Sequence, residues 1–201
     1  MKQPKNYKET KASGAYTPIS LGGHHLIIKK VAEVDKNGKV YKTKNGDPYI
    51  IVYFDMADND TQPKYGSVEF QNDVRPDKKW PHSCTSYITT EKEGKCTKQF
   101  KTFTTCYAHS NGLDEDAIVW GDGFCDQFTN KKIGGVFGEK ENLYQGKRSM
   151  RHELRWWCSD DKVDSATIPD PVRLEGAAGP IIDNDGFMDI PAGGPESSPW
   201  G

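Results

Sequence analysis

The stretch KRSMRHELRWWC, residues 147–158, is the segment around which the expected fold is arranged. Read with the two-residue period of a β-strand, the even positions from Met150 to Cys158 form a face that can be buried. The odd positions include Arg151, Arg155 and Trp157. Such a face suits an unpaired nucleic acid, because guanidinium groups bind phosphates and a base stacks on a ring for roughly 1–3 kcal/mol. Exposed strands also carry Arg and Trp without any ligand, so both interpretations stay open.

The run YIIVYFDM, residues 49–56, has the clearest strand pattern in the sequence. Alternation predicts a core face made of Ile50, Val52, Phe54 and Met56. On the opposite face Tyr49 and Tyr53 lie two residues apart and form a second platform for stacked bases. A helix or a second sheet over that face would explain the two tyrosines equally well.

The other predicted elements complete a mainly β fold with five strands. Further strands are expected at 21–34, 65–71 and 131–140, and residues 35–48 form a hairpin loop with two Asn-Gly turn signals. An amphipathic helix over 95–110 is predicted by the helical spacing of Cys96, Phe100, Phe103 and Tyr107. Five strands with one helix between the third and fourth is the element order of an OB-fold, a small Greek-key barrel that binds oligonucleotides.

Two connecting segments stand out. The sequence after residue 71 is too irregular for a regular element and carries Arg75, Lys78, Lys79 and Trp80. Long loops in compact domains are often functional, so these residues are candidates for phosphate and base contacts. The second segment, residues 113–130, is acidic and surrounds Trp120, which we assign to packing.

Composition restricts the class of protein. The 201 residues, of which 34% are hydrophobic and 28% charged, allow one domain with a tail. No apolar run approaches the ~20 residues that span a bilayer, and the N-terminal residues lack an apolar signal segment, so a cytosolic location is expected. The five cysteines have no metal-ligand spacing and are expected to be reduced, with Cys96, Cys106 and Cys158 in the core. His24 and His25 point to opposite faces of a strand, so no metal or cofactor is predicted, and no catalytic motif suggests an enzyme.

The charge is divided unevenly along the chain. Residues 1–158 hold 25 Lys and Arg against 20 Asp and Glu, whereas residues 159–201 hold 2 against 9. We therefore expect a flexible basic arm at 1–18, a nucleic-acid-binding domain at 19–160 and a disordered acidic tail at 161–201. Apolar anchors among acidic residues give the tail a short motif for docking on a partner. The motif consists of Asp185, Phe187, Met188, Asp189, Ile190 and Trp200.

Several segments also resemble a known group of proteins. These are ISLGGHHLIIKK, DKKWP, CTKQFKTF, KKIGGVFGEK and DGFMDIP, of which DKKW at 77–80 and GFMDIP at 186–191 are the most specific. The resemblance is to phage and mobile-element proteins of Gram-positive bacteria, some of which are described as single-stranded DNA-binding proteins. The tail is similar in plan to that of bacterial single-stranded DNA-binding proteins, with acidic residues before an apolar tip. It departs from that plan because few acids flank the final Ser-Pro-Trp-Gly.

Together these features predict a non-enzymatic single-stranded DNA-binding protein of phage or mobile-element replication and recombination. The basic face and the loop at 75–80 would bind phosphates, and Tyr49, Tyr53, Trp80 and Trp157 would stack bases. The tail would recruit replication or recombination proteins, and the chain could form a homo-oligomer. The alternative is a protein-interaction module, such as a phage inhibitor of a host enzyme, that uses the same aromatic face.

Overall fold

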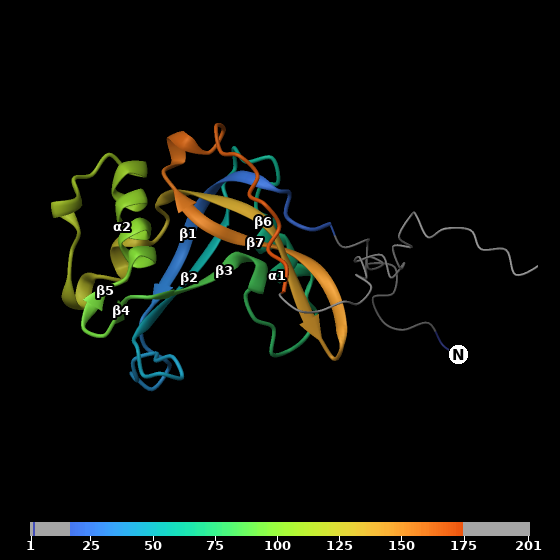
Figure 1. Cartoon of the computed structure of the whole chain (residues 1–201), viewed down its shortest axis with the longest axis horizontal. Helices are drawn as coiled ribbons and strands as arrows, with labels where there is room; N and C mark the ends of the chain where they lie inside the picture. The colour runs from blue at the N-terminus through green and yellow to red at the C-terminus, as the bar shows by residue number, and fades with distance from the viewer. Residues whose placement is uncertain (1, 3–16, 175–201) are drawn as a thin grey trace, which may run out of the picture.

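The computed structural model describes residue 2 and residues 17–174, and it is mainly β (Figure 1). Five strands form one antiparallel sheet in the order β3-β2-β1-β6-β7. They are β1 (Gly22–Ala32), β2 (Tyr49–Met56), β3 (Thr85–Thr89), β6 (Lys132–Tyr144) and β7 (Lys147–Cys158). A second, two-stranded sheet joins β4 (Glu91–Lys92) to β5 (Lys95–Cys96). No ladder joins β3 to β7 within the described residues, so the main sheet is not closed into the expected barrel.

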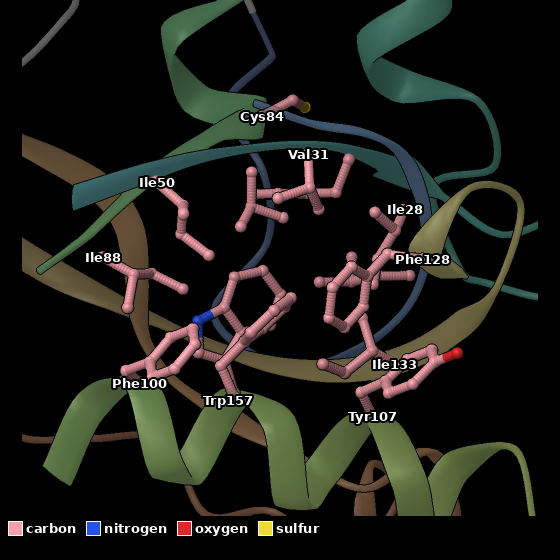
Figure 2. Packing of buried hydrophobic residues seen from close by; sticks show 14 of the residues in the cluster. Ile28, Val31, Ile50, Cys84, Ile88, Phe100, Tyr107, Phe128, Ile133 and Trp157 are labelled. Atoms are coloured by element: carbon pink, nitrogen blue, oxygen red, sulfur yellow. The ribbon is translucent and has the colours of Figure 1, made fainter. Parts of the chain in front are cut away.

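The core lies between the sheet and α2 (Lys98–Ser110), the predicted amphipathic helix (Figures 1 and 2). Thr97 caps the helix, because its hydroxyl accepts a hydrogen bond from the Phe100 backbone N–H at 3.1 Å. The helix buries Phe100, Phe103 and Tyr107. The predicted inward residues of β2 are all buried as well, and so are Ile51 and Asp55 of the opposite face, so both faces of this strand are partly covered. Cys96, by contrast, lies exposed on β5, so its expected core position is wrong.

The sequence predicted a strand at residues 65–71, and this prediction is wrong. These residues belong to the helix α1 (Tyr65–Asn72). The cause is Asp55, a buried residue of β2 whose carboxylate accepts hydrogen bonds from the backbone N–H groups of Gly66 at 2.7 Å and Ser67 at 3.1 Å. These N–H groups belong to the first turn and have no partner inside the helix. A cap supplied by a distant strand is invisible to local sequence patterns.

The third strand instead lies at β3, inside the segment that looked irregular in the sequence. A single 3₁₀ turn, His82–Cys84, leads into it, and β3 then pairs with β2 from Thr89 opposite Tyr49 to Thr85 opposite Tyr53. The order of five strands with α2 between the third and fourth is therefore kept, although the third strand is formed by other residues.

A β-bulge in β7 exchanges the inward and outward faces of its last residues, so the faces predicted for Trp156 and Trp157 are wrong. Val136 of β6 pairs with Trp156 and the next residue, Phe137, pairs with Leu154, which leaves Arg155 as the extra residue. One extra residue reverses which side chains point inward. Trp157, predicted to be exposed, is therefore 4% exposed, and Trp156, predicted to be buried, is 44% exposed. Trp157 packs edge-on against Phe54 and Phe103.

Residues 159–174 form a strap that packs on the sheet, although 161–174 were assigned to the disordered tail. Val163 is buried, and a Cβ on Gly23 of β1 would lie 2.1 Å from the Val163 carbonyl oxygen, so only glycine fits there. Further along, Val172 forms a parallel bridge with Lys140, and the Leu174 N–H donates to Glu141 at 2.8 Å. The strap follows β6 beyond the point where β6 leaves β1.

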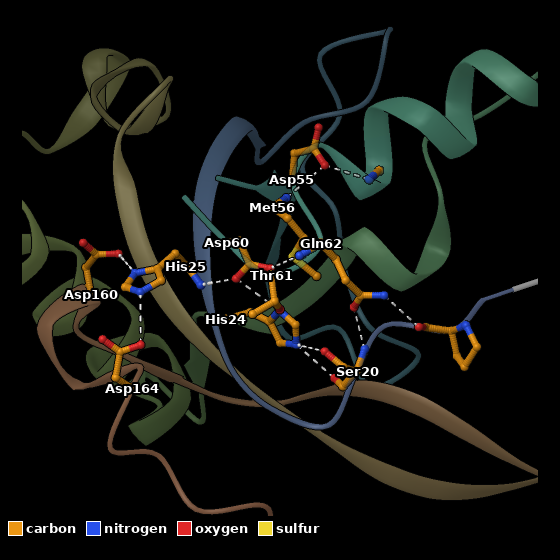
Figure 3. Close-up of polar contacts among 12 residues, drawn as sticks. Ser20, His24, His25, Asp55, Met56, Asp60, Thr61, Gln62, Asp160 and Asp164 are labelled. Carbon is orange, nitrogen blue, oxygen red and sulfur yellow. Dashed lines mark hydrogen bonds and ion pairs between the residues drawn. The ribbon is translucent and has the colours of Figure 1, made fainter. Parts of the chain in front are cut away.

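The paired histidines point apart and anchor two different segments (Figure 3). His24 is buried, with Nδ1 2.9 Å from Asp60 Oδ1 and Nε2 3.0 Å from the Ser20 carbonyl oxygen. This contact ties the start of the domain to the loop after β2. His25 reaches the strap instead, with Nδ1 2.7 Å from Asp160 Oδ1.

No cluster of metal-ligating side chains occurs within residues 17–174. None of the described helices is long and apolar enough to cross a membrane.

Candidate nucleic-acid interface

An open groove of about 1000 Å³ runs over the outer face of β1, β2 and β3, beside α1 and the loop that follows it. Four of its lining residues were predicted from the sequence: Tyr53, Arg75, Lys79 and Trp80. The remaining cations and rings that line it are Lys29, Lys30, Phe70, His82 and Tyr87. Four Lys and Arg against the two acids Glu69 and Asp73 give the lining an excess of positive charge.

A bulge in β1 supplies the two lysines. Ile28 pairs with Phe54 and Lys30 pairs with Tyr53, so Lys29 is an extra residue in the strand. Lys29 and Lys30 are both exposed and both line the groove. Strict alternation would send neighbouring side chains to opposite faces, and this pair was not among the residues predicted from the sequence.

Trp80 forms one wall of the groove and is held in place by its indole N–H. That group donates to the carbonyl oxygens of Phe54 at 3.0 Å and Cys84 at 3.1 Å. The indole ring packs against Phe70 of α1, with ring centroids 5.8 Å apart. With its polar atom satisfied by the backbone, Trp80 can present apolar ring surface to a ligand.

Tyrosines from β2, β3 and the β1–β2 loop form a row of ring contacts, in which Tyr53 and Tyr87 line the groove whereas the predicted Tyr49 and its neighbour Tyr41 do not. Tyr49 stacks on Tyr41 at 5.4 Å between centroids and meets Tyr87 edge-on at 6.1 Å. Tyr87 is 52% exposed, and its ring also contacts His82. Burial, followed by the nearby hydroxyls of Tyr41, Tyr87 and Tyr49, raises the pKa of Tyr53. Tyr53 therefore stays neutral at physiological pH and keeps an O–H donor within the groove.

The three cations of the loop after α1 differ in their contacts and in whether they line the groove. Arg75 donates from Nε and Nη2 to the Asp73 carboxylate at 2.9 and 2.7 Å. The Arg75 hydrogen bonds lower the pKa of Asp73 to about 2, so the pair stays ionised. Lys78 does not line the groove, and its Nζ lies 4.6 Å from the centroid of the Phe70 ring. Lys79 lines the groove directly.

The candidates on β7 lie outside this groove. Arg151 is exposed on β7, and Arg155 donates to the Glu139 carbonyl oxygen at 3.1 Å. Trp157 is in the core and is unavailable for stacking a base. The stretch most suited to nucleic acid in the sequence therefore gives the core Trp157 and lies outside the groove, whose rings come from α1, β2, β3 and the loop at 73–82. The predicted tail motif, from Asp185 to Trp200, lies outside the described residues.

Two signals in the sequence could have located the missed residues. The pair Lys29-Lys30 interrupts the apolar residues between Leu26 and Val31, and two neighbouring polar residues in such a run are compatible with a bulge. Tyr87 follows Trp80 and Pro81 in a segment without helical periodicity, where a short strand is possible. The cap from Asp55 to α1 has no comparable signal.

No protein-family model matches the sequence, and a comparison with curated proteins gives no match.

Proposed function

We propose that this protein binds single-stranded DNA with little sequence preference, in the replication or recombination of a phage or mobile element. The observation that carries the proposal is the groove, in which Tyr53, Trp80 and Tyr87 lie among Lys29, Lys30, Arg75 and Lys79. Rings that stack bases and cations that contact phosphates are the two components of a sequence-tolerant single-strand site.

The strand order supports an OB-type reading of the domain. The sheet order β3-β2-β1-β6-β7, with β6 returning to lie beside β1, matches a five-stranded Greek key that lacks its closing ladder, and the OB-fold is a partly open barrel of this kind. Such folds bind oligonucleotides on the face of the second and third strands and on the adjacent loops. The groove lies on that face, and Tyr41 extends the rings into the β1–β2 loop.

In the proposed mode of binding, bases stack on Tyr87, Trp80 and the neighbouring tyrosines while Lys29, Lys30 and Lys79 contact phosphates. Sequence preference is slight because every base offers a π-face. The acidic tail would recruit replication or recombination proteins and compete with DNA for the basic groove. That competition follows from charge, since residues 175–201 carry five acids and no Lys or Arg.

The test is fluorescence anisotropy of labelled oligo-dT at two salt concentrations, with duplex DNA as competitor, on the full chain and on a chain ending at residue 174. We expect binding that prefers the single strand and weakens steeply with salt, because released counterions contribute a slope of about −0.7 per phosphate contact. Removing the tail should tighten binding.

Matched variants locate the site. Lys29→Ala with Lys30→Ala should reduce the salt slope by about 1.4, whereas the exposed pair Lys92→Ala with Lys95→Ala on the β4–β5 hairpin should leave it unchanged. Tyr87→Ala should weaken binding about tenfold, which corresponds to the loss of one stacked base. If neither the full nor the shortened chain binds oligo-dT, the proposal fails, and the aromatic groove is then better explained as a protein-binding surface with little response to salt.

A further inference from the structure

Trp120 lies exposed on the segment between α2 and β6, although the sequence analysis assigned it to packing. Its side chain is 64% exposed, and that of the preceding Val119 is 51% exposed. One face of the indole stacks on Phe124, with centroids 5.3 Å apart and an angle of 12° between the ring planes. One face of the indole ring is therefore covered by Phe124, while much of the rest of its surface remains in contact with water.

The Gln127 side chain fixes the backbone on both sides of Trp120 and so limits the movement of the exposed ring. The Gln127 side chain accepts from the Val119 N–H at 3.0 Å and donates to the Val119 carbonyl oxygen at 2.8 Å. It also donates to the Phe124 carbonyl oxygen at 2.9 Å. Gly121, with φ of 82°, turns the chain directly after Trp120. A fixed, exposed Trp resembles an interface hot spot, because a partner that covers it does not have to order it first.

The chemistry around Trp120 favours a cationic partner. Residues 113–126 contain Asp114, Glu115, Asp116, Asp122 and Asp126 and no Lys, Arg or His. Glu115 is paired with Lys101 of α2. Asp122, between Trp120 and Phe124 in the sequence, and Asp126, two residues after Phe124, are exposed. A Lys side chain fits such a surface, because its ammonium can sit over the indole face and pair with a carboxylate.

We propose that the surface formed by Val119, Trp120, Asp122 and Asp126 binds the Lys-rich arm, residues 1–16, of a neighbouring copy of this chain. The arm contains Lys2, Lys5, Lys8 and Lys11 against the single acid Glu9, so its charge complements that of the surface. The N-terminal end of the domain and the segment after α2 lie at opposite ends of the molecule (Figure 1). Contacts between opposite ends repeat from copy to copy and produce rows rather than closed dimers.

A row of copies would make binding to a long single strand cooperative. This consequence rests on the proposed function, whereas the contact between the arm and the Trp120 surface does not. The two are therefore tested separately.

The first experiment titrates a labelled peptide of residues 1–16 with the full chain. We expect binding that weakens at least tenfold in Trp120→Ala and in Asp122→Lys with Asp126→Lys. Trp156→Ala, which removes an exposed Trp elsewhere, should bind the peptide normally. Equal binding by all the variants, or none by the unaltered chain, would overturn the proposal.

The second experiment measures sedimentation of full-length chains over a range of concentrations. Lys5→Glu with Lys8→Glu, and separately Asp122→Lys with Asp126→Lys, should each abolish self-association, and the four changes combined in one chain should restore it. The chain ending at residue 174 should still associate, since the acidic tail is not the partner of the arm. The proposal is contradicted if the unaltered chain stays monomeric at all concentrations. It is also contradicted if the chain with all four substitutions does not regain self-association.

DNA then separates the two proposals. Asp122→Lys with Asp126→Lys should bind a short oligo-dT at least as tightly as the unaltered chain and lose cooperativity on a long one. If the unaltered chain binds no short oligo-dT, the proposed function fails while the peptide and sedimentation results still decide the contact.

Discussion

The Asp73 carboxylate holds the Arg75 guanidinium at the rim of the groove through three contacts, Nε to Oδ1 at 2.9 Å, Nε to Oδ2 at 3.1 Å and Nη2 to Oδ2 at 2.7 Å. Asp73 is largely covered, with 17% of its side chain exposed, whereas Arg75 is 72% exposed. The pair therefore has an inner carboxylate and an outer guanidinium. This arrangement fixes the direction of the guanidinium and also offsets its charge, so a phosphate that binds Arg75 must share it with Asp73.

Asp73→Asn should tighten binding to single-stranded DNA. The change removes one negative charge from the groove while an amide oxygen can still accept from Arg75. Because water screens exposed charges strongly, we expect only a modest gain of about two- to fivefold in affinity, and only at low salt. Anisotropy with oligo-dT measures it. In an Arg75→Ala background the same substitution should give a smaller gain, and an equal gain there would mean that Asp73 acts on the groove without Arg75.

Trp157→Ala should unfold the domain more easily rather than remove a base contact. The indole is buried against Phe54 and Phe103, and loss of a buried Trp typically costs about 3–5 kcal/mol. Trp156→Ala, on the neighbouring exposed residue, should cost less than about 1 kcal/mol. Urea unfolding followed by circular dichroism gives both values. Similar costs for the two substitutions would contradict the inward turn of Trp157 after the bulge.

These two tryptophans show where sequence patterns were sufficient and where they were not. Alternation located the inward residues of β2, and helical spacing located α2, because both elements have a regular period and pack on the core. Two of the failures occur at one-residue irregularities, at Lys29 in β1 and at Arg155 in β7, where a single extra residue exchanges the two faces. The strand predicted at 65–71 failed for another reason, because Asp55 caps α1 from a distant strand. The Arg75–Trp80 loop was found because its composition differs from its surroundings. Lys29, Lys30 and Tyr87 were missed because the bulge and the short strand β3 that position them depend on pairing with distant strands.

Asp55→Ala should loosen α1 and weaken DNA binding together. The carboxylate caps the first turn of α1, and its loss leaves two backbone N–H groups near the core without an acceptor. A lost cap costs about 0.5–2 kcal/mol, and α1 carries Phe70, which supports Trp80 in the groove. Hydrogen exchange should show faster exchange within residues 65–72, and anisotropy should show a weaker complex. Unchanged protection of α1 would mean that its first turn does not depend on Asp55.

The contact between His25 and the strap should make stability depend on pH. Burial alone lowers the pKa of His25, but the hydrogen bond and charge of Asp160, with Asp164 beyond it, outweigh burial and raise the pKa above 6.5. Because the folded state binds the proton more tightly, this contact stabilises the protein fully below the unfolded pKa of 6.5 and loses its effect as pH rises through the folded pKa. The destabilisation caused by His25→Gln should therefore be larger at about pH 6 than at about pH 9. Urea unfolding of both proteins at the two pH values measures the difference, and groups common to both cancel.

Asp160→Asn provides the control for this pH effect. Without the carboxylate at 2.7 Å from His25 Nδ1, the pKa of His25 should fall, and most of the pH-dependent difference between the unaltered and His25→Gln proteins should disappear in this background. Hydrogen exchange of residues 159–174 gives a local readout, because the imidazolium joins the strap to β1. Exchange in the strap should quicken as pH rises by more than the intrinsic rate increases, and this excess should be absent from His25→Gln. An equal cost of His25→Gln at both pH values would show that the contact does not depend on the charge of the ring.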